Sequence, residues 1–169
     1  MDNTSPISEP PLPLVRGLVL AIFGTNGRLV ETGNHLVRPL GLTTAWWQVL
    51  GGIGYAPAPL PVAHIARNMG LTRQAVQRVV DVLATHGLVR FATNPHHQRA
   101  KLVVLTDAGS KALRDAEAAA AALDQTILER IGAARLSAAL TVLTDLAAIL
   151  AEHATDTPAT PDTVTKEDA

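Results

Sequence analysis

The sequence predicts a mainly α-helical fold with one small β-hairpin, and three features support this prediction. Apolar residues recur at helical spacing in long stretches near both ends of the chain. Two shorter helical stretches in the middle are separated by Gly70 and Leu71. Two apolar runs, residues 88–91 and 102–105, then flank the polar segment 93–99, and this arrangement is typical of a hairpin.

The first expected helix spans residues 14–37 and ends before Pro39 and Gly41. Its glycines lower the intrinsic helix propensity, so it needs other surfaces to pack against. Part of it, Gly24 to Arg28, reads GTNGR, but it lacks the preceding strand and the spacing of a phosphate-binding loop. We therefore assign this stretch no binding function.

A second helix is expected to begin after Thr43, which is a good N-cap residue, and to end near the pair Gly51-Gly52. Leu42 and Trp47 are spaced to form a hydrophobic staple across that start. A proline-rich loop is expected over residues 57–61.

Two short helices form the centre of the chain. The first is expected over residues 62–69, with Gly70 as its left-handed stop, and the second runs from its cap Thr72 to His86. The inward face of the second helix is predicted to consist of Ala75, Val76, Val79, Val82 and Leu83. Its outward face carries Arg73, Gln74, Gln77, Arg78 and Asp81.

After the hairpin, a long helix is expected over residues 107–131, where Gly132 breaks it. A last helix follows, and part of its leucine repeat is predicted to be a subunit interface: Leu136, Leu140, Leu143, Leu146 and Leu150. Residues 1–13 are expected to be a flexible arm and residues 154–169 a disordered tail, because both are rich in proline and small polar residues.

The composition limits the possible classes of protein. Apolar residues make up 47% of the chain and charged residues 17%, which predicts an ordered, soluble protein. Since there is no cysteine, disulfides, thiolate zinc sites and cysteine redox chemistry are excluded. The apolar stretch 17–27 is too short to span a bilayer and no signal-peptide layout precedes it, so we expect a cytoplasmic protein without a membrane partner.

Charge is distributed unevenly along the chain. The net charge is −1, yet residues 60–105 hold six Arg and Lys residues and the single acid Asp81. This segment therefore carries +5, which leaves −6 for the rest. Such asymmetry indicates a polyanionic partner for the basic segment.

Two short helices and a hairpin in this order predict a winged helix-turn-helix, in which the second helix enters the major groove of duplex DNA. Thr72 is suited to a phosphate contact, and four planar side chains are suited to base edges: Arg73, Gln74, Gln77 and Arg78. In the wing, the expected contacts to the minor groove or the backbone come from His96, His97, Arg99 and Lys101.

The chain resembles the MarR (multiple antibiotic resistance regulator) family over about residues 14–153. The resemblance rests on LTTAWWQVL (42–50), VAHIARNMGLTRQAVQRVVDVLATHGLV (62–89) and NPHHQRAKLVVLTDAGSKAL (94–113). It implies a homodimer formed by the first and last helices, with 14–41 and 107–153 as the dimerisation region and 42–106 as the DNA-binding region. It also implies that the helix after Thr72 is the recognition helix.

The family's wing usually reads Asp-Pro-x-Asp-Arg-Arg, whereas this chain has Asn94, Pro95, His96, His97, Gln98 and Arg99. The tip arginine is thus kept, while both acids and one arginine are replaced, so the internal salt bridge of the wing is in question. The resemblance further implies a pocket for a small aromatic effector, for which the candidate lining residues are His35, Arg38, Trp46 and Trp47.

Other interpretations of these residues remain open. The tryptophans are more often core residues than a ligand platform, and a plain polar turn explains the two wing histidines equally well. No catalytic constellation, cofactor fingerprint or metal-ligand spacing is present in the sequence, so we expect neither an enzyme nor a cofactor. The expected function is a ligand-responsive repressor that binds a palindromic operator. The rival is a winged helix that binds protein and not DNA, although its exposed helix face should then be apolar.

Overall fold

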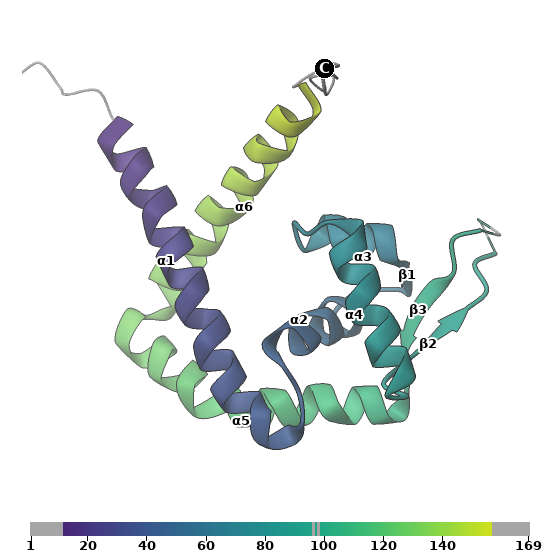
Figure 1. Cartoon of the computed structure of the whole chain (residues 1–169). Coiled ribbons are helices and arrows are strands. Elements are labelled where there is room, and N and C mark those ends of the chain that lie inside the picture. Colours follow the sequence, from purple (N-terminus) through teal and green to yellow (C-terminus); the bar gives the residue numbers. More distant parts are fainter. Residues whose placement is uncertain (1–11, 96, 98, 157–169) are drawn as a thin grey trace, which may run out of the picture. The chain divides into compact units, whose positions relative to one another are not determined.

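The computed structural model describes residues 12–95, 97 and 99–156, which form six α-helices and a small sheet (Figure 1). The helices are α1 (Leu12–Val37), α2 (Thr44–Gly54), α3 (Val62–Asn68), α4 (Arg73–Thr85), α5 (Asp107–Ile131) and α6 (Ala133–Asp156), and a 3-10 turn, η1, spans Arg38–Leu40. The strands are β1 (Leu60–Pro61), β2 (Val89–Ala92) and β3 (Leu102–Leu105). The predicted fold class, mainly α with a hairpin wing, is confirmed.

The chain divides into two compact units, residues 1–121 and residues 122–169. The first unit holds α1 to α4, the sheet and the first part of α5. The second consists, in its described part, of the end of α5 and α6. Two predicted boundaries shift: α1 begins at Leu12, inside the expected arm, and α6 continues to Asp156, inside the expected tail. The rest of the arm and the tail lies outside the described residues.

α1 and α2 meet at a tight joint. The amide of Thr44 donates to Oδ1 of Asn34 at 2.9 Å, and the Thr44 hydroxyl donates to the carbonyl of Val30 at 2.9 Å. A Cβ on Gly33 would lie 2.7 Å from Oγ1 of Thr44, so only glycine admits this approach. Thr43 caps α2 as predicted, because its Oγ1 accepts from the amide of Trp46.

α2 ends at Gly54, two residues beyond the pair Gly51-Gly52 near which it was expected to end, so both glycines lie inside the helix. A Cβ on Gly52 would lie 2.9 Å from Sδ of Met69. The glycine therefore lets α2 approach the end of α3 closely. The pair serves packing, which single-sequence patterns do not distinguish from a stop signal.

The sheet has the order β1-β3-β2, and both pairings are antiparallel. β2 and β3 form the predicted hairpin, with Val89 opposite Leu105 and Ala92 opposite Leu102. β1 lies within the stretch predicted to be a proline-rich loop, and it pairs with β3 through Leu60 and Pro61. A proline at a two-residue edge strand gives no local strand signal, which explains why β1 was missed.

The core of the first unit lies between α2, α3, α4 and the sheet. α4 contributes Val76, Val80 and Leu83, each fully buried. These three follow the spacing i, i+4, i+7 of one helix face. The predicted inward face is therefore partly wrong: Val82 is 39% exposed, because it lies about 200° around the helix from Val80.

α5 begins against the start of β2. The Thr106 hydroxyl donates to the carbonyl of Gly87 at 2.7 Å and to that of Leu88 at 3.1 Å, while its oxygen accepts from the amide of Gly109 at 3.0 Å. A Cβ on Gly109 would lie only 1.9 Å from the Leu88 carbonyl oxygen. The base of the wing and α5 therefore approach so closely at Gly109 that no side chain fits between their backbones.

α6 has an apolar surface. Among the described residues, its segment Ala133–His153 is long and apolar enough, by length and composition alone, to cross a membrane; its mean hydropathy is 1.6 and none of it is buried. The sequence-based expectation of no membrane partner did not consider this segment. It contains the leucine repeat, of which Leu140 is 67% exposed. The repeat as a subunit interface remains a prediction.

The α5–β2 junction yields a stability prediction. Gly109→Ala should lower the free energy of unfolding by about 1–3 kcal/mol, because the added methyl overlaps a backbone carbonyl and forces the helix to shift. Thermal or urea unfolding measures this loss. Gly27→Ala is the control, since nothing lies within 4 Å of a Cβ there and helix propensity favours alanine. Equal stability of Gly109→Ala and the wild type would contradict the described junction.

Candidate DNA-binding surface

The turn between α3 and α4 sets the direction of α4. Gly70 has φ +64°, which suits glycine, and its amide donates to the carbonyl of Arg67 at 3.2 Å. The amide of Leu71 donates to the carbonyl of Ala66 at 2.9 Å. The predicted stop at Gly70 is confirmed, and α4 starts three residues later from a defined turn.

Thr72 is the N-cap of α4, as predicted. Its Oγ1 accepts from the amide of Ala75 at 3.2 Å. The side chain is exposed, and its hydroxyl still carries a proton that a phosphate oxygen can accept. The first-turn amides that the cap leaves open add to the attraction of this helix end for an anion.

The outward face of α4 is polar and accessible. Arg73, Gln74 and Arg78 are exposed, and Gln77 is half-buried. These four side chains line one shallow hollow. The apolar stripe beneath them holds this face outward, so the four candidates for base contacts lie together on one surface.

A second hollow, of about 370 Å³, lies between α4 and the wing. It is lined by Arg73 and Gln77 of α4 and by two cationic side chains of the wing, Arg99 and Lys101. Its remaining lining residues carry no charge: Pro61, Val62, Ala63, Phe91 and Ala100. The hollow thus combines three cations with an apolar wall, a composition that suits a phosphate and its sugar.

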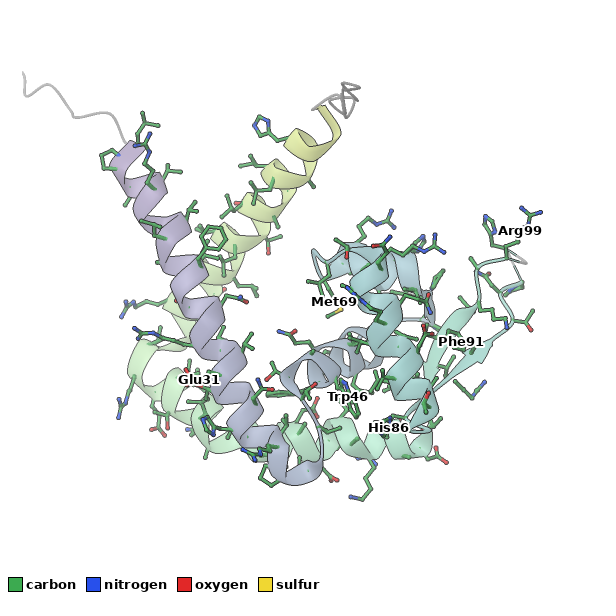
Figure 2. All side chains as sticks on the ribbon, in the orientation of Figure 1. Glu31, Trp46, Met69, His86, Phe91 and Arg99 are labelled. Carbon is green, nitrogen blue, oxygen red and sulfur yellow. The ribbon has the colours of Figure 1, made fainter. Side chains whose placement is uncertain are left out.

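Sequence reasoning missed the wall of this hollow. Phe91 is 39% exposed on β2, where the sequence pattern indicated only an apolar strand residue. Figure 2 shows Phe91 near the base of the wing and Arg99 near its tip. Phe91 lines the same hollow as Arg73 of α4 although the two residues lie far apart in sequence, so this proximity is seen only in the folded chain.

The wing tip is held by a backbone turn. The amide of His97 donates to the carbonyl of Asn94 at 3.3 Å, and the amide of Ala100 donates to the carbonyl of His97 at 3.1 Å. His97 and Arg99 are exposed, whereas His96 lies outside the described residues. Within residues 12–95, 97 and 99–156, the ion pair found is Lys111–Asp115, so Arg99 has no such pair there.

The candidate effector residues fall into two groups. His35 and Arg38 are exposed near the end of α1, while Trp46 and Trp47 are half-buried and pack against the core. The ring of Trp46 meets that of His86 edge-on, with centroids 4.7 Å apart. This contact gives Trp46 a packing role, and its part in an effector site remains a prediction.

Comparison with known proteins assigns the class. A family model described as MarR family matches residues 40–100, which span α2 to the wing tip. The chain is 33% identical over 121 residues to the uncharacterized protein Rv2011c of Mycobacterium tuberculosis, covering 72% of this chain and 83% of that protein.

Two solved structures carry the comparison further. The chain resembles CouR from Rhodococcus jostii RHA1 bound to p-coumaroyl-CoA, with a TM-score of 0.67, 26% identity, and coverage of 78% of this chain and 90% of that one. It also resembles the transcriptional repressor CouR bound to a 23-mer DNA duplex, with a TM-score of 0.66, 26% identity, and coverage of 85% and 99%.

These matches, with the fold, define a winged helix-turn-helix transcription regulator. The chain belongs to the MarR family. Members of this family are DNA-binding proteins and not enzymes.

The two cationic elements of the surface should differ in their effect on binding. Arg73→Ala should cost about 1–3 kcal/mol for a lost base contact and relax sequence preference at one position. Arg99→Ala should weaken binding to all duplexes evenly and flatten the salt dependence. Dissociation constants over a salt series measure both effects, with Arg114→Ala on α5 as a charge-matched control. Operator binding by Arg99→Ala equal to the wild type at every salt concentration would contradict the wing assignment.

Proposed function

We propose that the chain is a ligand-responsive repressor that binds a palindromic operator as a homodimer in the cytoplasm. The observation that carries this proposal is the continuity of the basic surface from α4 to the wing. The hollow between them brings Arg73 and Gln77 together with Arg99 and Lys101. A duplex lying across this surface would place α4 in the major groove, with the wing against the adjacent backbone or minor groove.

Within this proposal each side chain has a role. Arg73, Gln74, Gln77 and Arg78 read base edges, and Thr72 and Lys101 bind phosphates. Arg99, His96 and His97 contact the minor groove or the DNA backbone. The rival function, protein association without DNA binding, is disfavoured because the exposed face of α4 is polar.

The dimer is supported by apolar surface on two separate helices. On α1, Leu14 is 77% exposed and Phe23 is 70% exposed; on α6, Leu140 is 67% exposed. Exposed apolar side chains of this kind support a subunit interface, since each Å² of apolar surface removed from water contributes about 25 cal/mol. We therefore propose residues 14–41 and 107–153 as the dimerisation region and residues 42–106 as the DNA-binding region.

A small aromatic effector is the remaining part of the proposal. The related CouR structure holds p-coumaroyl-CoA. For this chain we propose that a small aromatic acid binds near His35, Arg38, Trp46 and Trp47. A thermal-shift screen of such acids, with Arg38→Ala as the comparison, tests this part.

Selection of bound sites from a pool of random duplexes tests the proposed function. The expected result is an imperfect palindrome with half-sites about 10 base pairs apart, because a two-fold dimer presents its helices to successive major grooves. Arg73→Ala/Arg78→Ala is the control and should enrich no site. If the wild type also enriches none, the repressor proposal fails and the protein-association module is favoured.

Without DNA, the chain should sediment as a dimer at micromolar concentration. Phe23→Asp or Leu140→Asp should shift it towards monomer without lowering helix content, because both side chains are exposed within the chain itself. Sedimentation velocity and circular dichroism provide the two measurements. A wild-type monomer would rule out the dimer.

The wing histidines predict that DNA binding depends on pH. Histidine changes charge between about pH 8 and pH 6, and a neighbouring phosphate favours the charged form. DNA affinity should therefore rise as pH falls over that range, with about one more released counterion in the salt slope for each fully coupled ring. The control is the double variant His96→Gln/His97→Gln. An unchanged pH dependence in that variant would assign the effect to other groups.

A further inference from the structure

One acidic residue lies on α4 next to the basic surface. Asp81 is the only Asp or Glu between residues 60 and 105, and it lies on α4. Its Oδ1 accepts a hydrogen bond of 2.7 Å from Nε2 of Gln77, one helical turn before it. An acid beside a proposed polyanion site opposes binding, so its place next to Gln77 calls for a physical reason.

The position of Gln77 gives this bond its importance. Gln77 lines both hollows of the basic surface and is half-buried. Arg73, Gln77 and Asp81 are spaced four residues apart, so they form one row along the helix. Arg78 is three residues from Asp81, yet the described residues include no ion pair between them. Instead, the carboxylate accepts a hydrogen bond from the amide of Gln77.

The bond to Asp81 decides how Gln77 presents its amide. A glutamine amide has two N–H donors and one acceptor oxygen, and either end can point outward when the side chain rotates. Because the carboxylate only accepts, it selects the rotamer in which Nε2 faces Asp81. One N–H and Oε1 then remain for a partner, and this donor and acceptor match N7 and the N6 amino group of adenine.

We propose that Asp81 is a specificity-determining positioning residue, which orients the Gln77 amide for adenine and weakens binding to unselected DNA. The inference rests on the proposed function, in which α4 is the recognition helix. Orienting the amide before binding reduces the conformational freedom lost on contact, so the correct base gains more than a wrong one. The negative charge repels phosphates in every register, which disfavours non-specific complexes.

A double-mutant cycle tests this inference. The variants are Gln77→Ala, Asp81→Ala, the double variant and Asp81→Asn. Asp115→Asn on α5, where Asp115 is half-buried and paired with Lys111, serves as a control that removes the same charge outside the basic segment. The measurement is the dissociation constant for the selected operator, for its single-base variants and for a shuffled duplex. Thermal unfolding of each variant confirms that the fold is retained.

The positioning role predicts a specific pattern. Asp81→Ala should reduce discrimination by about fivefold or more at one base pair, the same pair that Gln77→Ala affects. The double variant should lose no more than Gln77→Ala alone. Asp81→Asn can accept from Gln77 or donate to it, so it should retain only part of the discrimination, between that of Asp81→Ala and that of the wild type. Both Asp81 variants should bind the shuffled duplex severalfold more tightly, and Asp115→Asn should not.

Three results would overturn the inference. Unchanged discrimination in Asp81→Ala would show that Gln77 needs no partner. Additive losses at a different base pair would show that Asp81 itself accepts from a cytosine amino group. A wild type that binds operator and shuffled duplex equally would overturn the proposed function together with the inference, and that outcome is visible before any variant is made.

Discussion

The orientation of α4 about its own axis is the constraint on which the proposed DNA-binding surface depends. Val76, Val80 and Leu83 are fully buried, and their side chains allow only one orientation of the helix. The turn at Gly70 and the cap at Thr72 fix where the helix starts. The polar residues lie on the other side of the helix from this stripe. Burial of the stripe therefore exposes Arg73, Gln74 and Arg78 to solvent. The surface is thus a consequence of the core.

The wing depends on a second, independent junction. Its base is held by the pairing of β2 with β3 and by the packing of Gly109 against Leu88, which ties the hairpin to α5. Its tip depends on two backbone hydrogen bonds around His97. The base is therefore defined by close packing, whereas the tip is defined by a local turn. If DNA binds as proposed, α4 keeps its register on the bases while the less constrained Arg99 adapts to the DNA backbone.

Local signals in the sequence predicted most of the elements. Caps such as Thr43 and Thr72 and left-handed glycines such as Gly70 act within a few residues, so a single sequence reveals them. Contacts between distant segments were missed: β1 is defined by its pairing with β3, and Gly52 inside α2 allows Met69 to approach closely. The base-reading candidates on α4 were predicted from spacing. The exposed ring of Phe91, in contrast, requires the folded wing.

The joint between α1 and α2 links the two proposed regions of the first unit. Thr44 is hydrogen-bonded to Asn34 and to Val30, and the absence of a side chain at Gly33 lets the two helices approach closely at this point. A change in the direction of α1 must therefore move α2 with it or break these contacts. His35 and Arg38 precede this joint in the chain, and Trp46 and Trp47 follow it. A molecule that contacted both groups would act on the joint, and it would shift DNA binding only as far as it favours one arrangement of α1 and α2 over another.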